Sequence, residues 1–93
     1  MGNIIILLSS STSAVRLKES LERGGYSARV IQTPSKLASG GCNYSVRTSG
    51  NALALAEQTI KNIGLKSRGI YLDTESEDNM RYRRLPPEGR SGG

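Results

Sequence analysis

Five consecutive aliphatic residues near the N-terminus, Ile4 to Leu8, constrain the fold of this chain more than any other feature. Successive side chains of a strand point to opposite faces of its sheet, so this run is apolar on both faces. We therefore predict a buried central strand over residues 3–9. The core around it must be aliphatic, because the 93-residue chain contains four Tyr but neither Phe nor Trp. A chain of this length forms one small domain.

Two segments have helical periodicity. The first helix is predicted over roughly residues 12–23, where Ala14, Leu17 and Leu21 share one face. Hydroxyl side chains before it can cap its start, and the glycine pair after Arg23 can end it. The second helix opens at Gly50-Asn51, with Asn51 as the expected N-cap and Gly64 at its end. Its apolar face is made by Leu53, Ala56, Ile60 and Ile63.

Three further segments predict strands, at residues 26–33, 44–48 and 67–73. The first of them alternates in the way that is typical of an edge or half-exposed strand. Thr33-Pro34 predicts a helix of about one turn between the first two of these strands. The resulting βαββαβ order predicts an α+β, ferredoxin-like fold, with a four-stranded antiparallel sheet and two helices on one face. We expect residues 1–73 to form this domain and residues 74–93 to form a disordered charged tail.

One face of such a sheet is left without helices. The first strand places apolar residues on that face, and exposed apolar patches usually mark interfaces. The sequence therefore predicts a homo-oligomer, such as a dimer, or a protein partner on the open sheet face.

Composition removes several classes of function. The chain has no histidine, which excludes His-based acid–base catalysis and Cys-His pairs within one chain. One cysteine makes neither an internal disulfide nor a multi-thiolate metal site, so we expect no metal and no cofactor. No run of about 18 apolar residues is present, so we expect no membrane partner. A lone cysteine fits a reducing compartment, which indicates a cytoplasmic protein.

The net charge of +5 invites a nucleic-acid interpretation. Four of the basic residues, however, lie in the predicted tail beside acidic residues. The third strand offers a single aromatic residue, Tyr44, which we expect to pack inward. The aromatic signature of an RNA-binding sheet is missing, so a nucleic-acid partner is not expected.

Cys42 is the candidate functional residue. Gly40 and Gly41 precede it, and they let the backbone turn sharply and leave the sulfur sterically open. A thiol presented in this way can act as a nucleophilic thiolate that accepts another atom. Lys36 and Arg47 are the cations available to stabilise the thiolate. The alternative is that Cys42 is a small, half-buried apolar residue, as many free cysteines are.

Taken in order, these motifs resemble the selenium/sulfur carrier-like family of small bacterial proteins. The likeness covers residues 3–73. In the first half of the chain it rests on the apolar strand with its hydroxyl-rich turn, the glycine-bearing helix end, and Thr33-Pro34 with Lys36. It continues with Ser39-Gly40-Gly41-Cys42, which has Arg47 five residues after the cysteine, and ends with Gly69-Ile70-Tyr71. Members often carry Gly directly after the cysteine, where this chain has Asn43.

The resemblance implies that Cys42 holds sulfur or selenium as a persulfide or selenopersulfide. Lys36, Arg47, Gly40 and Gly41 would then form its binding surroundings, and donor and acceptor proteins would be the partners. Such a chain is a carrier or an accessory protein rather than an enzyme. The residues leave a second class open, a non-catalytic binding module or oligomeric regulatory subunit with a protein or, less readily, an RNA partner.

Overall fold

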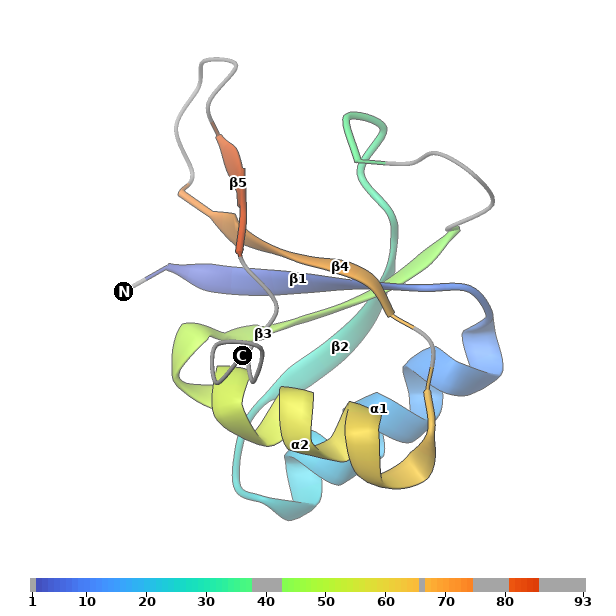
Figure 1. Cartoon of the computed structure of the whole chain (residues 1–93). Helices are drawn as coiled ribbons and strands as arrows, with labels where there is room; N and C mark the ends of the chain where they lie inside the picture. The colour runs from blue at the N-terminus through green and yellow to red at the C-terminus, as the bar shows by residue number, and fades with distance from the viewer. Residues whose placement is uncertain (1, 38–42, 66, 75–80, 86–93) are drawn as a thin grey trace, which may run out of the picture.

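The computed structural model describes residues 2–37, 43–65, 67–74 and 81–85 of the chain. Within them, the strands and α-helices follow the order β-α-β-β-α-β-β along the chain (Figure 1). The elements are β1 (Asn3–Leu8), α1 (Ser11–Arg23), β2 (Ala28–Gln32), β3 (Tyr44–Ser49), a short 3-10 helix η1 (Gly50–Ala52), α2 (Leu53–Ile63), β4 (Ser67–Asp73) and β5 (Tyr82–Arg84).

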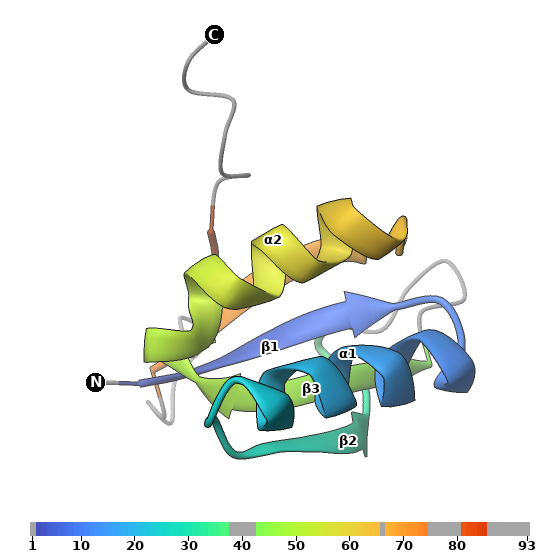
Figure 2. The same ribbon diagram turned by 90° about the horizontal axis from the view of Figure 1, so that it is seen from below.

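The described strands form one sheet in the order β2-β3-β1-β4-β5, and every neighbouring pair is antiparallel. Both helices lie on one side of this sheet, as Figures 1 and 2 show from two directions. The predicted α+β architecture is confirmed at this level. The predicted count of four strands is wrong, because β5 adds a fifth strand beside β4, with Tyr71 opposite Arg84.

β1 occupies the centre of the sheet, and its five aliphatic residues are at most 3% exposed. On the helix side, Ile4, Ile6 and Leu8 form the main core with Leu17, Leu21 and other buried residues of α1, β3 and α2. On the opposite side, Ile5 and Leu7 form a second cluster with Ile31, Leu37, Tyr71 and Tyr82. The buried central strand predicted from the sequence is therefore present.

This second cluster corrects one expectation about the open sheet face. Ile5 and Leu7 are 0% and 3% exposed, so they do not form the exposed apolar patch expected there. The turn that ends at Leu37 and strand β5 both lie on the side away from the helices (Figure 1). The oligomer or partner inferred from that patch stays a prediction.

Local side-chain chemistry sets the helix ends. Ser10 caps α1 by accepting a hydrogen bond from the Ser13 N–H at 3.1 Å. The prediction that Asn51 caps the second helix is wrong. Ser49 accepts from the Asn51 N–H at 3.2 Å and starts η1, which then continues into α2. Gly64 ends α2 with a φ of 70°, a left-handed conformation that favours glycine.

Residues 34–37 form a turn rather than the predicted one-turn helix. Its hydrogen bond runs from the Leu37 N–H to the Pro34 carbonyl at 2.8 Å. Among the described residues, no helix has the length and apolar character needed to span a membrane.

Strand β5 is anchored by a buried carboxylate. Asp73, at the end of β4, is fully buried and accepts from the Arg81 guanidinium at 2.8 and 3.2 Å and from Arg47 at 2.7 Å. The backbone adds two hydrogen bonds, from the Thr74 N–H to Arg81 and from the Leu85 N–H to Ile70, each 2.8 Å long. A buried charge is stable only when it is paired, so Asp73 binds the segment before β5 to the sheet.

We expect Asp73→Asn to lower the free energy of unfolding by about 2 kcal/mol, because charge-assisted hydrogen bonds to two arginines are lost. Urea unfolding of the full chain measures this effect. The control is Glu22→Gln, which breaks the exposed Lys18–Glu22 pair at 3.1 Å. Exposed pairs contribute about 0–1 kcal/mol, so equal losses in the two variants would contradict the role given to Asp73.

Candidate functional site

The predicted acceptor Cys42 and its neighbours Gly40 and Gly41 lie outside the described residues. The residues on either side of them define the base of the segment that carries the cysteine. β2 and β3 are paired as far as Gln32 opposite Tyr44. One step further, the Thr33 N–H donates to the Asn43 carbonyl at 3.2 Å. The two ends of the segment are thus joined where the β2–β3 pair ends.

A second bond reinforces this junction. The hydroxyl oxygens of Thr33 and Ser45 are 2.7 Å apart, and either group can donate. Ser45 is fully buried and lies opposite Leu7 in the sheet. Its hydroxyl therefore needs a partner within the protein, and Thr33 supplies one. The sequence analysis placed Thr33 at the end of a strand and at a helix start, but nothing in a linear sequence pairs it with a residue twelve positions away.

A hollow of about 410 Å³ lies at the same end of the sheet. It is lined by Gln32, Thr33, Asn43 and Tyr44. Asn43 directly follows Cys42 in the chain, so this hollow borders the cysteine-bearing segment in sequence. Its lining is mainly polar side chains and backbone, which suits a small polar group better than an apolar ligand.

The structure places Lys36 in the turn that leads toward Cys42. The turn packs its next residue, the half-buried Leu37, against the cluster around Ile5 and Leu7. Lys36 itself is exposed. Its ammonium group is therefore free to move through solvent around the turn, as long lysine side chains do.

The predicted role of Arg47 beside Cys42 stays a prediction, because Cys42 lies outside the described residues. Arg47 lies in the middle of β3, opposite Ile5, and donates to Asp73 at the end of β4. Strands rise about 3.3 Å per residue, which puts its Cα about 13 Å along β3 from Asn43. The guanidinium reaches toward the sheet end at which β1 begins, whereas Asn43 lies at the end where β1 finishes.

In the part of the chain that the structure describes, no group of three or more His, Cys, Asp or Glu side chains is arranged to hold a metal ion. The described polar side chains at this end of the sheet carry hydroxyl, amide and ammonium groups.

The fold and this site define an α+β protein in which a cysteine-bearing segment joins β2 to β3. The family model described as "Putative Se/S carrier protein-like" matches residues 3–72, and the chain belongs to that family. The resemblance identified from the sequence motifs is confirmed. The matched range includes Cys42 and ends just before Asp73, so β5 lies beyond it. No curated protein and no solved structure matches the chain.

The Thr33–Ser45 bond can be tested with a double-mutant cycle. We expect Thr33→Val and Ser45→Ala each to lower the free energy of unfolding by about 1–2 kcal/mol, because each leaves one hydroxyl without its partner. The double variant should lose less than the sum of the two, since both polar groups are then absent. Urea unfolding of the four proteins measures the coupling. Strict additivity would contradict the bond.

Proposed function

We propose that this protein is a carrier that accepts a sulfur or selenium atom on the thiol of Cys42 and passes it to another protein. The observation that carries the proposal is the family match over residues 3–72, a range that contains the only cysteine of the sequence. A carrier needs one accessible nucleophile and a stable scaffold, and the chain has the residues for both.

The transfer is a thiol–disulfide exchange. The Cys42 thiolate attacks the outer sulfur of a persulfide donor, R–S–SH. The sulfur–sulfur bond of the donor breaks, its thiolate R–S⁻ leaves, and Cys42 carries the persulfide Cys42–S–SH. One sulfur–sulfur bond forms as one breaks, so no oxidant or reductant is consumed. A selenopersulfide donor, R–S–SeH, delivers selenium in the same way, and attack by an acceptor thiolate on the outer atom regenerates Cys42.

The surrounding residues have distinct roles in this proposal. Gly40 and Gly41 leave room for the donor to approach the sulfur, since they carry no side chain. Lys36 supplies positive charge that favours the thiolate and the anionic leaving group. Arg47 contributes by supporting the sheet through Asp73, and the Thr33–Asn43 and Thr33–Ser45 bonds fix the base of the segment.

We also propose that the fold is of the ferredoxin-like class with an added strand. The support is the βαββαβ order of β1 to β4 with the two helices, and the strand order β2-β3-β1-β4 within the larger sheet. Donor and acceptor proteins are the proposed partners, and the cytoplasm is the proposed location, because a persulfide carrier works with reduced thiols.

The carrier proposal predicts a covalent adduct on one residue. After incubation of the reduced protein with a small-molecule persulfide donor, intact mass spectrometry should show the gain of one sulfur atom. Dithiothreitol should remove that atom, because a thiol attacks a persulfide. Cys42→Ser is the matched variant and should gain nothing. An adduct that persists in Cys42→Ser, or no adduct on the parent protein, would falsify the proposal.

The role of Lys36 has its own test. We expect Lys36→Gln to slow the alkylation of Cys42 by iodoacetamide about twofold at low salt, the size of effect typical of an exposed charge. Added salt should reduce the difference. Lys61→Gln removes an exposed lysine at the end of α2 and serves as the control. Equal rates for the parent protein and Lys36→Gln would remove Lys36 from the site.

A further inference from the structure

Arginine side chains line up across the sheet face that carries no helix. The strand registers place Arg29, Arg47, Ile5, Tyr71 and Arg84 in one row that crosses the described sheet from β2 to β5. Neighbouring strands lie about 4.8 Å apart, so the row is about 19 Å long. We call Arg29, Arg47 and Arg84 the arginine row.

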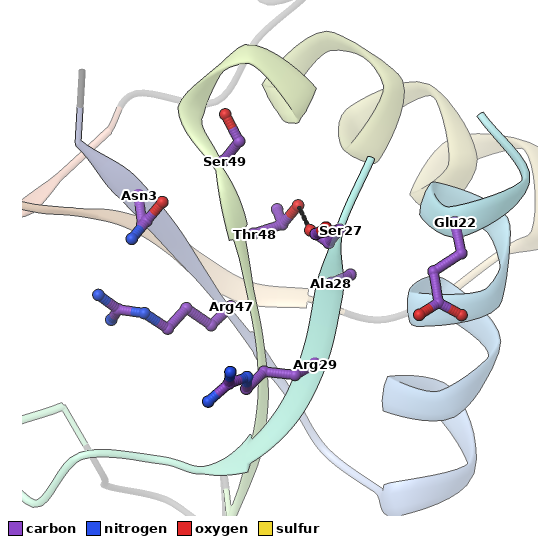
Figure 3. Close-up of a pocket in the computed structure, with 8 residues that line it drawn as sticks. All are labelled: Asn3, Glu22, Ser27, Ala28, Arg29, Arg47, Thr48 and Ser49. Atoms are coloured by element: carbon purple, nitrogen blue, oxygen red, sulfur yellow. Dashed lines mark hydrogen bonds between the residues drawn. The ribbon is translucent and has the colours of Figure 1, made fainter. Parts of the chain in front are cut away.

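The two ends of this row are accessible. Arg29 on β2 and Arg84 on β5 are exposed. Figure 3 shows Arg29 and Arg47 extending side by side in the same direction, away from Glu22 on α1. They help to line a groove of about 490 Å³, whose lining also includes the polar residues Asn3 and Ser49 and the acidic residue Glu22. At the other end, the Arg84 guanidinium lies 6.0 Å from the centre of the Tyr71 ring.

The exposed charges of the arginine row, on Arg29 and Arg84, are both positive. Arg29 lies directly opposite Arg47, and like charges in that position destabilise a strand pair. The carboxylate of Asp73 is buried on the same face, where it accepts hydrogen bonds from Arg47 and Arg81. Arg29 lies three strands away from Asp73, and Arg84 lies opposite Tyr71, so these two exposed arginines provide the positive charge that an anionic partner could pair with.

We propose that this face binds single-stranded nucleic acid. A row about 19 Å long suits an extended polyanion better than a single phosphate group, because its exposed ends are too far apart for one phosphate to bridge. Tyr71 and Tyr82 are half-buried on this face, and the guanidinium groups of Arg84 and Arg81 lie over their rings. Phosphate contacts from arginines combined with stacking on aromatic and guanidinium planes are the means by which sheets bind single strands without sequence preference.

This inference departs from the sequence-based expectation for a physical reason. Tyr44 shares the helix-side orientation of Val46 in β3, so it does not lie on the open face; it is exposed, and the expectation that it packs inward is wrong. The aromatic residues that matter are Tyr71 and Tyr82, and they become neighbours only when β5 pairs with β4. The proposal is independent of the carrier function, since it uses no atom of Cys42.

Fluorescence anisotropy with labelled single-stranded RNA of about 12 nucleotides, within the usual site size of such surfaces, tests the proposal. The full chain should bind at low salt and weaken as salt rises. The variant Arg29→Gln/Arg84→Gln should bind at least about tenfold more weakly. Its slope of log affinity against log salt should fall by about 1.4, the value for two lost contacts to a single strand.

The control variant is Arg16→Gln/Arg83→Gln, which has the same net charge. Arg16 is exposed on α1, and Arg83 neighbours Arg84 on β5 but lies opposite Leu72, on the other face of the sheet. If the control variant binds RNA about as tightly as the parent protein, the role of the arginine row is supported. If it loses as much affinity as Arg29→Gln/Arg84→Gln, that role is overturned. Thermal melting followed by circular dichroism checks that both variants fold, and the single variants Arg29→Gln and Arg84→Gln allow the same comparison.

Three further ligands test which kind of polyanion this face binds. Single-stranded DNA that binds comparably supports the proposal, because stacking and phosphate contacts are common to both polymers. Duplex RNA or polyglutamate that binds as tightly overturns it, since neither offers free bases. Absence of salt-dependent binding to any single strand also overturns it. Cys42→Ser should bind RNA like the parent protein, so that loss of sulfur transfer and loss of RNA binding remain distinguishable.

Discussion

The side chains of β1 pack in two directions at once. Ile4, Ile6 and Leu8 face the helices, whereas Ile5 and Leu7 face a second cluster on the other side of the sheet. Burial of one aliphatic side chain contributes about 1.5–3 kcal/mol, so the five together contribute on the order of 10 kcal/mol. This is comparable to the whole net stability of a small domain, about 5–15 kcal/mol. The residues that cover Ile5 and Leu7 are therefore necessary to the fold. Leu37, in the turn leading toward Cys42, and Tyr82 of β5 both belong to it.

Asp73 organises the polar half of that second face. It binds Arg47 of β3 and Arg81 beside β5, and it thereby joins strands that are not neighbours in the sheet. The pairing gives Arg47 a structural role in the sheet. In the carrier proposal Lys36 is the cation assigned to the thiolate, because it lies in the turn that precedes Cys42 in the chain. Arg29 and Arg84 are outside the Asp73 group and give the face its exposed positive charge.

Periodicity predicted the elements that depend on local pattern. β1, α1 and the body of α2 lie within about two residues of their predicted positions, since apolar spacing and helix-ending glycines determine them. β5 was missed because its three residues, Tyr82 to Arg84, alternate too briefly to be recognised, and a distant carboxylate holds the segment in place. The motif around Cys42 led to the correct family. The Thr33–Ser45 bond could not be predicted, because it depends on the register of two strands.

The outer edges of the described sheet carry a further consequence. One edge is β2, which has five residues and an exposed arginine, and the other is β5, which has three residues, two of them arginines. An edge strand leaves unpaired backbone groups on which another chain can add a strand, and short or charged edges hinder that addition. Arg29 and Arg84, which give the open face its positive charge, thus also hinder the addition of further strands at the two edges of the sheet.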